Sequence, residues 1–481
     1  MGYSLLRDVL VGSMRPPRNT NDPVTSLLTM AAPARPNQQS RDLIRAYGAF
    51  QQTIPVLAPT SDIRDIARFN GNKDAPIHRW FSFKEGFSAS LLPWLCHAVP
   101  LYPESIRNIL DPFCGSGTSL LSAQLHFPCS QPPDLVGVEH NPFIRFVAEA
   151  KLSWPHYSPD TIRRLMPKVL APGRRHKDYP LPSLGTIHDK RAFRRHTIQE
   201  LMSLRARIDS YARDLAEHDF LLLGWASIIE KVSGLRKDGR ALRFRSVYPR
   251  ASVRNALESQ WNLMLTDLVG LSSAAIPSGL ARVRVVQGDG RTLPSSAFRG
   301  GSFDLIVYSP PYLNNIDYSE VYKLELWLTG MVLDAGQFRE LRRRSFRSHP
   351  SVAFPETDLV RGLSVQSWPS RLVEAIIHAL PEDDDRNWRD KMIRGYADDM
   401  YLALRSQFRV ARPGGHVVCV VGNSLHGRAP STVPVATDLL IAALAQEVGF
   451  QISALQVGRQ LPRRDGQNDL LRESILMMRR P

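Results

Sequence analysis

Cysteine is scarce in this chain of 481 residues, and its four copies form no metal-binding or redox motif. Cys96, Cys114, Cys129 and Cys419 are far apart, and no two of them make a CxxC pair. This spacing indicates neither a disulfide framework nor a zinc site. We therefore expect a cytoplasmic protein that works in a reducing environment and needs no metal ion.

Long apolar runs and acidic residues are also in short supply. No run approaches the roughly 18 apolar residues of a membrane span, and the N-terminus lacks the apolar core of a signal peptide, so we expect no membrane association. Only 46 Asp and Glu oppose 61 Lys and Arg, which gives a net charge of +15. This excess favours an anionic partner, nucleic acid above all, although a merely basic surface would show it too.

The order of apolar segments predicts an α/β domain with two interruptions. Strands followed by helices recur before residue 150 and after residue 280, as in a doubly wound sheet. The last two strands, 450–457 and 474–478, are expected to form an antiparallel pair. In chain order we expect a disordered segment (1–40), the first part of the domain (41–150), a basic, mostly helical insertion (151–280), the catalytic part (281–330), a second insertion (331–395) and the C-terminal part (396–481).

A glycine-rich turn joins the first strand of this domain to its first helix. The strand 106–110 runs into Asp111-Pro112-Phe113-Cys114-Gly115-Ser116-Gly117-Thr118, and the helix 119–125 follows. Glycine lets backbone amides approach a ligand closely, and a helix N-terminus adds partial positive charge. Strand, glycine turn and helix in this order are the context that a ligand-cradling loop requires.

Acidic residues follow the next two strands. Glu139 ends the strand 135–138, about 20 residues past the glycines, which is the position from which an acid binds a ribose diol. Asp289 follows the strand 283–286, where it could accept a hydrogen bond from an adenine amine. An ordinary Asp-Gly turn explains Asp289 equally well.

A rigid loop follows the fourth strand, 303–307, and reads Tyr308-Ser309-Pro310-Pro311-Tyr312. Two consecutive prolines stop the strand, because neither can donate a ladder hydrogen bond, and they hold the backbone extended. Open α/β sheets bind their ligands at the carboxyl ends of the strands. The loop therefore presents one hydroxyl group and one aromatic ring where a ligand is expected.

Both insertions contain basic clusters. Residues 151–280 hold 22 Lys and Arg against 12 Asp and Glu, which is most of the chain's excess positive charge. Either insertion could therefore contact a nucleic acid. The expected nucleic-acid-binding residues are Arg236, Lys237, Arg240, Arg243 and Arg245 in the first insertion and Arg342, Arg343, Arg344 and Arg347 in the second.

Residues 72–150 and 281–481 resemble the class I S-adenosylmethionine-dependent methyltransferases, of the type that methylates amino groups in DNA. The resemblance is carried by DPFCGSGT (111–118) and SPPY (309–312). The two insertions lie outside it, and either of them could read the DNA target. The resemblance implies a Rossmann-like methyltransferase sheet, S-adenosylmethionine as the cofactor and double-stranded DNA as the partner. It also implies cognate proteins of a restriction or defence system.

The resemblance also implies roles for individual residues. Asp111 and the amides of Gly115 and Gly117 would hold the methionine part of the cofactor, Glu139 its ribose and Asp289 its adenine. The remaining cofactor contacts would be Pro112, Phe113, Cys114 and Thr118 in the loop and Lys84 and Phe87 in an upstream element. Ser309 and the Pro310 carbonyl would accept hydrogen bonds from the target amine, Pro311 would stiffen the loop, and Tyr312 would stack on the flipped base.

Several reactions remain open from the sequence. Methylation at cytosine carbon 5 needs a cysteine nucleophile after proline, but Pro128-Cys129 precedes the second strand and is interpreted as a loop. Serine at position 309 resembles the cytosine-N4 enzymes more than the adenine-N6 enzymes. Site-specific cytosine-N4 methylation of DNA is thus the leading hypothesis. Its alternatives are adenine-N6 methylation, an RNA base methyltransferase, and a catalytically inactive nucleic-acid-binding protein.

Overall fold

The computed structural model describes most of the chain. It covers residues 36–60, 63, 66, 72–83, 86–98, 102–127, 131–172, 192–238, 241–272, 281–365, 367–428, 431–461 and 470–481. Lys84, Cys129 and Arg240 lie outside these ranges, as does most of the segment predicted to be disordered. The boundary of that segment at residue 40 is wrong, because helix α3 (Pro36–Gln51) already begins at Pro36.

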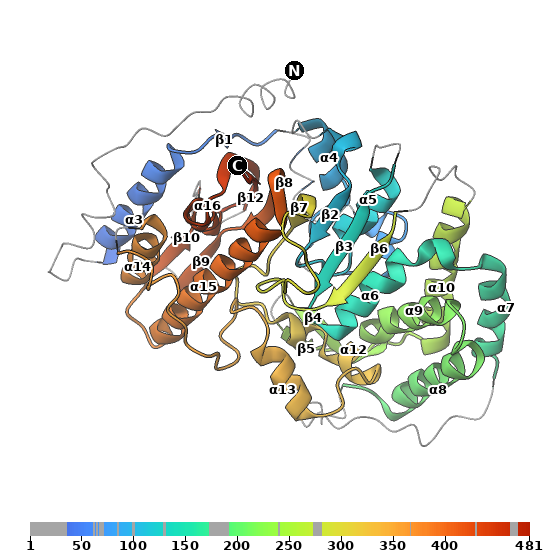
Figure 1. The fold of residues 1–481 in the computed structure, drawn as a ribbon. Coiled ribbons are helices and arrows are strands. Elements are labelled where there is room, and N and C mark those ends of the chain that lie inside the picture. The colour runs from blue at the N-terminus through green and yellow to red at the C-terminus, as the bar shows by residue number, and fades with distance from the viewer. Residues whose placement is uncertain are drawn as a thin grey trace.

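The centre of the molecule is an eight-stranded sheet with the order β1-β11-β12-β8-β7-β2-β3-β6 (Figure 1). Every neighbouring pair is parallel except the two pairs that contain β12. The predicted Rossmann-like sheet and its antiparallel pair are therefore confirmed. The strands are β1 (Val56–Leu57), β2 (Asn108–Asp111), β3 (Asp134–Glu139), β6 (Val283–Gln287), β7 (Phe303–Tyr308), β8 (Ala411–Gly422), β11 (Gln451–Gln460) and β12 (Arg472–Arg479).

Helices cover both faces of the sheet, and each face has its own apolar core. Leu305 and Val307 of β7 point into one core, while Ile306 and Tyr308 point into the other, as the alternation of a strand buried on both faces requires. The first core includes residues of α4 (Leu91–Ala98), α5 (Thr118–His126) and α6 (Pro142–Leu152). The second includes residues of α3, α14 (Trp368–Ala379), α15 (Arg386–Val410) and α16 (Thr437–Val448).

The first insertion is mostly helical, as predicted, and it extends the first core. Trp225 and Trp261 are buried in the same cluster as Phe143 of α6. A Cβ atom at Gly224 would lie 2.3 Å from the Trp261 ring, so only glycine allows the two helices to approach this closely. The elements are α7 (Pro159–Leu170), α8 (Arg195–Ala212), α9 (Glu217–Val232), the hairpin of β4 (Leu235–Asp238) and β5 (Ala241–Phe244), and α10 (Val253–Ser272).

No loop separates the second insertion from the C-terminal part of the domain, because helix α15 leads directly into strand β8. Helix α15 runs from Arg386 to Val410, so the predicted boundary at residue 395 falls inside a helix. No helix in the described ranges is long and apolar enough to cross a membrane. The remaining elements are α11 (Tyr318–Val321), α12 (Lys323–Leu328), α13 (Ala335–Arg343), the hairpin of β9 (Ser424–Arg428) and β10 (Ser431–Val435), and the 3-10 helices η2 (His78–Trp80), η3 (Pro103–Ser105) and η4 (Trp154–His156).

Candidate active site

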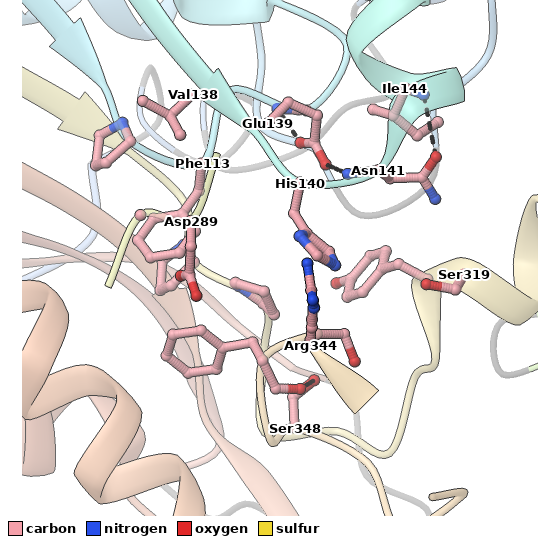
Figure 2. Close-up of a pocket in the computed structure, with 18 of the residues that line it drawn as sticks. Phe113, Val138, Glu139, His140, Asn141, Ile144, Asp289, Ser319, Arg344 and Ser348 are labelled. Carbon is pink, nitrogen blue, oxygen red and sulfur yellow. Dashed lines mark hydrogen bonds between the residues drawn. The ribbon is translucent and has the colours of Figure 1, made fainter. Parts of the chain in front are cut away.

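A pocket lies at the carboxyl ends of β2, β3, β6 and β7, where this class of sheet binds ligands. Its empty volume is about 890 Å³, part of it open to solvent, which suits an organic ligand of cofactor size. Figure 2 shows Phe113, Glu139, His140, Asp289 and Arg344 among the side chains that surround it. The sequence-predicted residues that line it are Pro112, Phe113, Gly115, Glu139, Asp289, Ser309, Pro310, Pro311 and Arg344.

The glycine loop has the backbone geometry that its sequence predicts. Gly115 and Gly117 have φ angles of 51° and 81°, in the left-handed region that favours glycine. Asp111 is buried beneath the loop, where it accepts hydrogen bonds from the Ser119 hydroxyl and, at 3.0 Å, from the Phe113 amide. Burial raises the pKa of Asp111 to about 7, against the opposing effect of these hydrogen bonds. Asp111 therefore shapes the loop and does not line the pocket.

Glu139 is held in place by backbone amides on both of its carboxylate oxygens. Gly115 N donates to one oxygen at 3.0 Å, and Asn141 N donates to the other at 2.8 Å. Desolvation raises the pKa of Glu139 to about 7, although the amides of Asn141 and Gly115 oppose the shift. Each oxygen retains lone-pair directions that the amides do not use, so the carboxylate can accept further hydrogen bonds from a ligand.

Asn141 serves both the helix and the pocket. Its side-chain oxygen caps α6 by accepting from the amides of Phe143 and Ile144, as Figure 2 shows for Ile144. Its Nδ2 atom is buried and has no hydrogen-bond partner among the described residues. Such an atom needs a partner, and a ligand in the pocket that Asn141 lines would provide one.

Asp289 follows β6 and carries a fixed charge partner. Arg291 donates to both of its oxygens, and Arg291 Nη1 also donates to Asp399 at 3.0 Å. Arg347 of the second insertion also donates to Asp399, through its Nη2 atom at 2.7 Å. A chain of paired charges, in which Asp399 and Arg347 are buried, therefore connects the pocket wall to the second insertion. Gly290 is confined as well, because a Cβ atom there would lie 2.3 Å from the Pro112 carbonyl oxygen.

Ser309 carries a second unsatisfied polar atom of the pocket, besides Asn141 Nδ2. It follows β7 directly, and the Oγ atom is buried without a hydrogen-bond partner in the described part of the chain. Leaving a buried hydroxyl unpaired costs about 1–3 kcal/mol. A ligand that donates a hydrogen bond here would recover this free energy.

Tyr312 corrects one expectation from the sequence. Its side chain does not line the pocket but is buried over Gly422, where a Cβ atom would lie 3.1 Å from the ring. The stacking role predicted for Tyr312 is therefore not supported by its position.

Other predicted cofactor residues lie beneath the pocket. Cys114 is buried against Gly137, and Gly117 is packed against Ala148 of α6. Phe87 is buried in the first core, and Phe83 lines the pocket in its place. Thr118, at the start of α5, is also buried and does not line the pocket. These residues pack beneath the loop and do not line the pocket, so the direct cofactor contact predicted for them is wrong.

The second insertion forms one wall of the pocket, of which the sequence indicated only Arg344. Phe346 meets Phe113 edge-on, with ring centroids 5.7 Å apart. His140 Nε2 lies 3.0 Å from the Leu341 carbonyl oxygen, which ties the end of β3 to α13. The unpredicted lining residues are Phe83, Val138, His140, Asn141, Ile144, Gly288, Gly290, Tyr318, Ser319, Ser345, Phe346, Ser348 and His349. The lining residues next to Glu139, Asp289 and Arg344 could have been found as neighbours of predicted residues, but nothing local indicates the others.

The predicted nucleic-acid-binding cations divide into exposed and buried groups. Arg236, Arg243, Arg343 and Arg344 are exposed. Lys237 is buried and pairs with Glu325, and Arg347 is buried against Asp399. The prediction is wrong for these two, because a paired charge in the interior cannot contact a phosphate group. Arg342 is partly buried and donates to Asp317, and Arg245 is partly buried and donates to the Leu235 carbonyl.

Comparison with known proteins finds relatives that match most of the length of this chain. No protein-family model matches. The chain is 24% identical over 432 residues to the type II methyltransferase M.BsoBI of Geobacillus stearothermophilus, which covers 81% of each chain. It is 26% identical over 421 residues to the type II methyltransferase M.AvaI of Nostoc sp., covering 82% of this chain and 83% of the relative.

The chain also matches solved structures, at low identity and low TM-score. TrmN from Thermus thermophilus is 10% identical, with 82% of this chain and 49% of that chain covered, at a TM-score of 0.25. The chain is thus similar, over about four fifths of its length, to two type II methyltransferases.

Proposed function

We propose that the protein is a site-specific DNA methyltransferase that transfers a methyl group from S-adenosylmethionine to the exocyclic amine of a flipped base. The sequence relatives support the class of reaction. The observation that carries the assignment is the buried, unpaired Ser309 hydroxyl, which follows β7 and shares one pocket with Glu139. The methyl donor and the target amine must lie next to each other for transfer, and a single pocket lined by both Glu139 and Ser309 can hold the two together.

The pocket residues fit S-adenosylmethionine, which supplies an electrophilic methyl group on a sulfonium ion when it is bound. Glu139 is oriented to accept hydrogen bonds from ribose hydroxyls, and the unpaired Nδ2 of Asn141 can donate one. Asp289 would accept from the adenine amine, and Phe113 supplies apolar contact. The amide of Gly115 is already bound to Glu139, so the methionine part would depend on other donors of the loop.

The chain's own contribution to the reaction is positioning. A base amine is a poor nucleophile, because its lone pair is delocalised into the ring. Ser309 Oγ and the Pro310 carbonyl would accept hydrogen bonds from its two N–H groups and favour a pyramidal nitrogen, whose lone pair can then attack in line. The Pro310-Pro311 backbone keeps these acceptors fixed, so little reorganisation is needed at the moment of reaction.

Cytosine N4 is the preferred target, with adenine N6 as the alternative. The preference comes from serine in the tetrapeptide, which resembles the cytosine-N4 enzymes. A role in restriction or phage defence with cognate proteins is part of the same proposal, and the type II class of the relatives supports it.

Identification of the methylated nucleoside tests the proposal. The protein is incubated with methyl-labelled S-adenosylmethionine and either duplex DNA or RNA, and the nucleic acid is then digested and analysed. We expect label in N4-methyldeoxycytidine. Label in N6-methyldeoxyadenosine would change the base, label in RNA alone would contradict the DNA assignment, and cofactor and DNA binding without transfer would favour an inactive binding protein.

A further inference from the structure

The second insertion contains a groove beside the active-site pocket. Its empty volume is about 1420 Å³, part of it open to solvent, and its lining comes from residues 347–395. His349 lines both the groove and the pocket. The Phe354 ring meets His349 edge-on, with centroids 5.3 Å apart, on the groove side. The groove therefore begins where the wall of the pocket ends.

We propose that this groove binds the DNA strand on which the target base lies, and that the second insertion reads the bases next to it. The inference rests on the proposed function, since a base held at Ser309 must leave its flanking nucleotides near His349. Phe354 and Trp388 line the groove and are both partly exposed, so their rings can contact neighbouring bases. Arg361, which is exposed at the same groove, would contact a phosphate group.

The charges of the groove indicate recognition by stacking and hydrogen bonding more than by phosphate neutralisation. Arg347 is neutralised by Asp399, Lys391 pairs with Glu356 at 2.7 Å, and Arg394 pairs with Glu374 and Asp390. Among the cations of the groove, Arg361 forms no ion pair with a described residue. Binding in the groove should therefore depend only weakly on salt, apart from the contribution of Arg361.

A partly buried hydrogen-bond network connects the groove to the pocket. Arg347 Nη1 donates to Thr357 Oγ1 at 2.5 Å, and that hydroxyl donates to Asp398, which also accepts from Val360 N. The same Arg347 binds Asp399, which holds Arg291 and, through it, Asp289 in the pocket wall. A strand in the groove would thus meet the pocket in a fixed geometry, as methyl transfer requires.

The first insertion offers no such surface at the pocket. None of its described residues lines either the pocket or the groove. Two of its exposed cations, Arg236 and Arg243, lie on the β4–β5 hairpin, and Arg243 is paired with Asp238. We therefore assign base recognition to the second insertion and, at most, phosphate contacts to the hairpin.

Binding measurements on matched variants test this assignment. Phe354→Leu/Trp388→Leu removes both rings but keeps apolar side chains, and Arg361→Ala removes the unpaired charge. Tyr211→Ala removes a half-exposed ring from the first insertion as the control. Affinity for a fluorescent duplex that the wild-type protein methylates is measured by anisotropy at several salt concentrations, together with cofactor affinity and Tm.

We expect the double variant to bind DNA about tenfold more weakly at every salt concentration, because base–aromatic stacking is lost. Arg361→Ala should lower the slope of log affinity against log salt by about one. Tyr211→Ala should bind within about twofold of wild type, and cofactor affinity and Tm should change little in all variants.

Three outcomes would overturn the inference. The first is a double variant that binds and methylates DNA as the wild type does, and the second is a larger loss in Tyr211→Ala than in the groove variants. The third is a double variant that loses cofactor affinity as much as DNA affinity, which would indicate general damage to the pocket. A wild-type protein that neither binds nor methylates duplex DNA would refute the proposed function and this inference with it.

Discussion

The two insertions are both basic, yet their charged residues do different things. In the first, Lys237 is buried and pairs with Glu325, while Asp267 is buried and binds Arg79 and the Trp80 indole. In the second, Arg344 lines the pocket, and Arg347 connects it to the neighbouring groove. The first insertion therefore stabilises the fold beside the sheet, whereas the second completes the site. A basic segment does not by itself identify a functional surface, because the position of each cation in the fold decides whether it can reach a ligand.

Removing Lys237 should produce the largest effect on stability. Lys237→Ala leaves Glu325 buried without its cation, which costs about 3–5 kcal/mol of unfolding free energy. Urea denaturation measures the loss. Lys237→Met with Glu325→Leu is the control, because it removes both charges and should be far less destabilising. Unchanged stability with lost DNA binding in Lys237→Ala would move the nucleic-acid surface to the first insertion.

Neutralising Asp399 should affect the site through the second insertion. Asp399→Asn leaves Arg291 and Arg347 sharing an uncharged partner, so Asp289 loses its fixed orientation. We expect cofactor affinity to fall about tenfold, together with a stability loss of about 2 kcal/mol. Calorimetric titration measures the affinity. Asp390→Asn, on the same helix α15 but paired with Arg394, should leave it unchanged.

The pH dependence of cofactor binding should come from Glu139, the last residue of β3, and not from a residue of either insertion. The raised pKa of Glu139, about 7, means that its carboxyl group ionises as the pH rises through 7, and the ionised form is the stronger acceptor for the two hydroxyls of a diol. We expect affinity to rise by about tenfold between pH 6 and pH 8. Glu139→Gln should bind weakly and show little dependence on pH over this range.

In the free protein, the raised pKa of Glu139 makes stability fall as the pH rises, whereas cofactor affinity is expected to rise. Because the folded-state pKa of Glu139 is raised, its contribution to stability is present at low pH and is lost as the pH rises through about 7. The cofactor should therefore stabilise the protein more at pH 8 than at pH 6. A gain in Tm on cofactor addition that falls over this interval would contradict the role given to Glu139.

Removing an exposed cation of the hairpin should have the smallest effect. Arg236→Ala should weaken duplex binding less than about threefold at moderate salt and lower the salt slope by about one, since at most one phosphate contact is lost. Arg163→Ala on α7 is the matched control and should leave the slope unchanged. A loss as large as that expected for the groove variants would show that the hairpin contributes more than a phosphate contact.

Local sequence signals predicted the sheet and much of the pocket. The apolar strands, the glycine pair at 115 and 117, and the prolines at 310 and 311 each act through their own backbone, so adjacent residues are enough to recognise them. Glu139 and Asp289 line the pocket because parallel strands bring their carboxyl ends together.

Long-range packing decided what the sequence could not show. His349 lines the same pocket as Glu139 from 210 residues away in the chain, and no local pattern indicates that proximity. Lys237 has the sequence context of a surface cation, but Glu325 and the ring of Tyr322 hold it inside. Tyr312 turns toward Gly422 because that residue leaves space for its ring. Each of these depends on a partner that is distant in sequence.

Methyl transfer by Ser309→Ala tests the central claim most directly. Single-turnover transfer to duplex DNA is compared with that of the wild type and of Ser319→Ala, which removes another buried hydroxyl from the same pocket. We predict that Ser309→Ala lowers the rate by about a hundredfold or more with cofactor affinity within about twofold of wild type, while Ser319→Ala stays within about threefold. A Ser309→Ala variant that transfers methyl groups at the wild-type rate would contradict the assignment of this pocket.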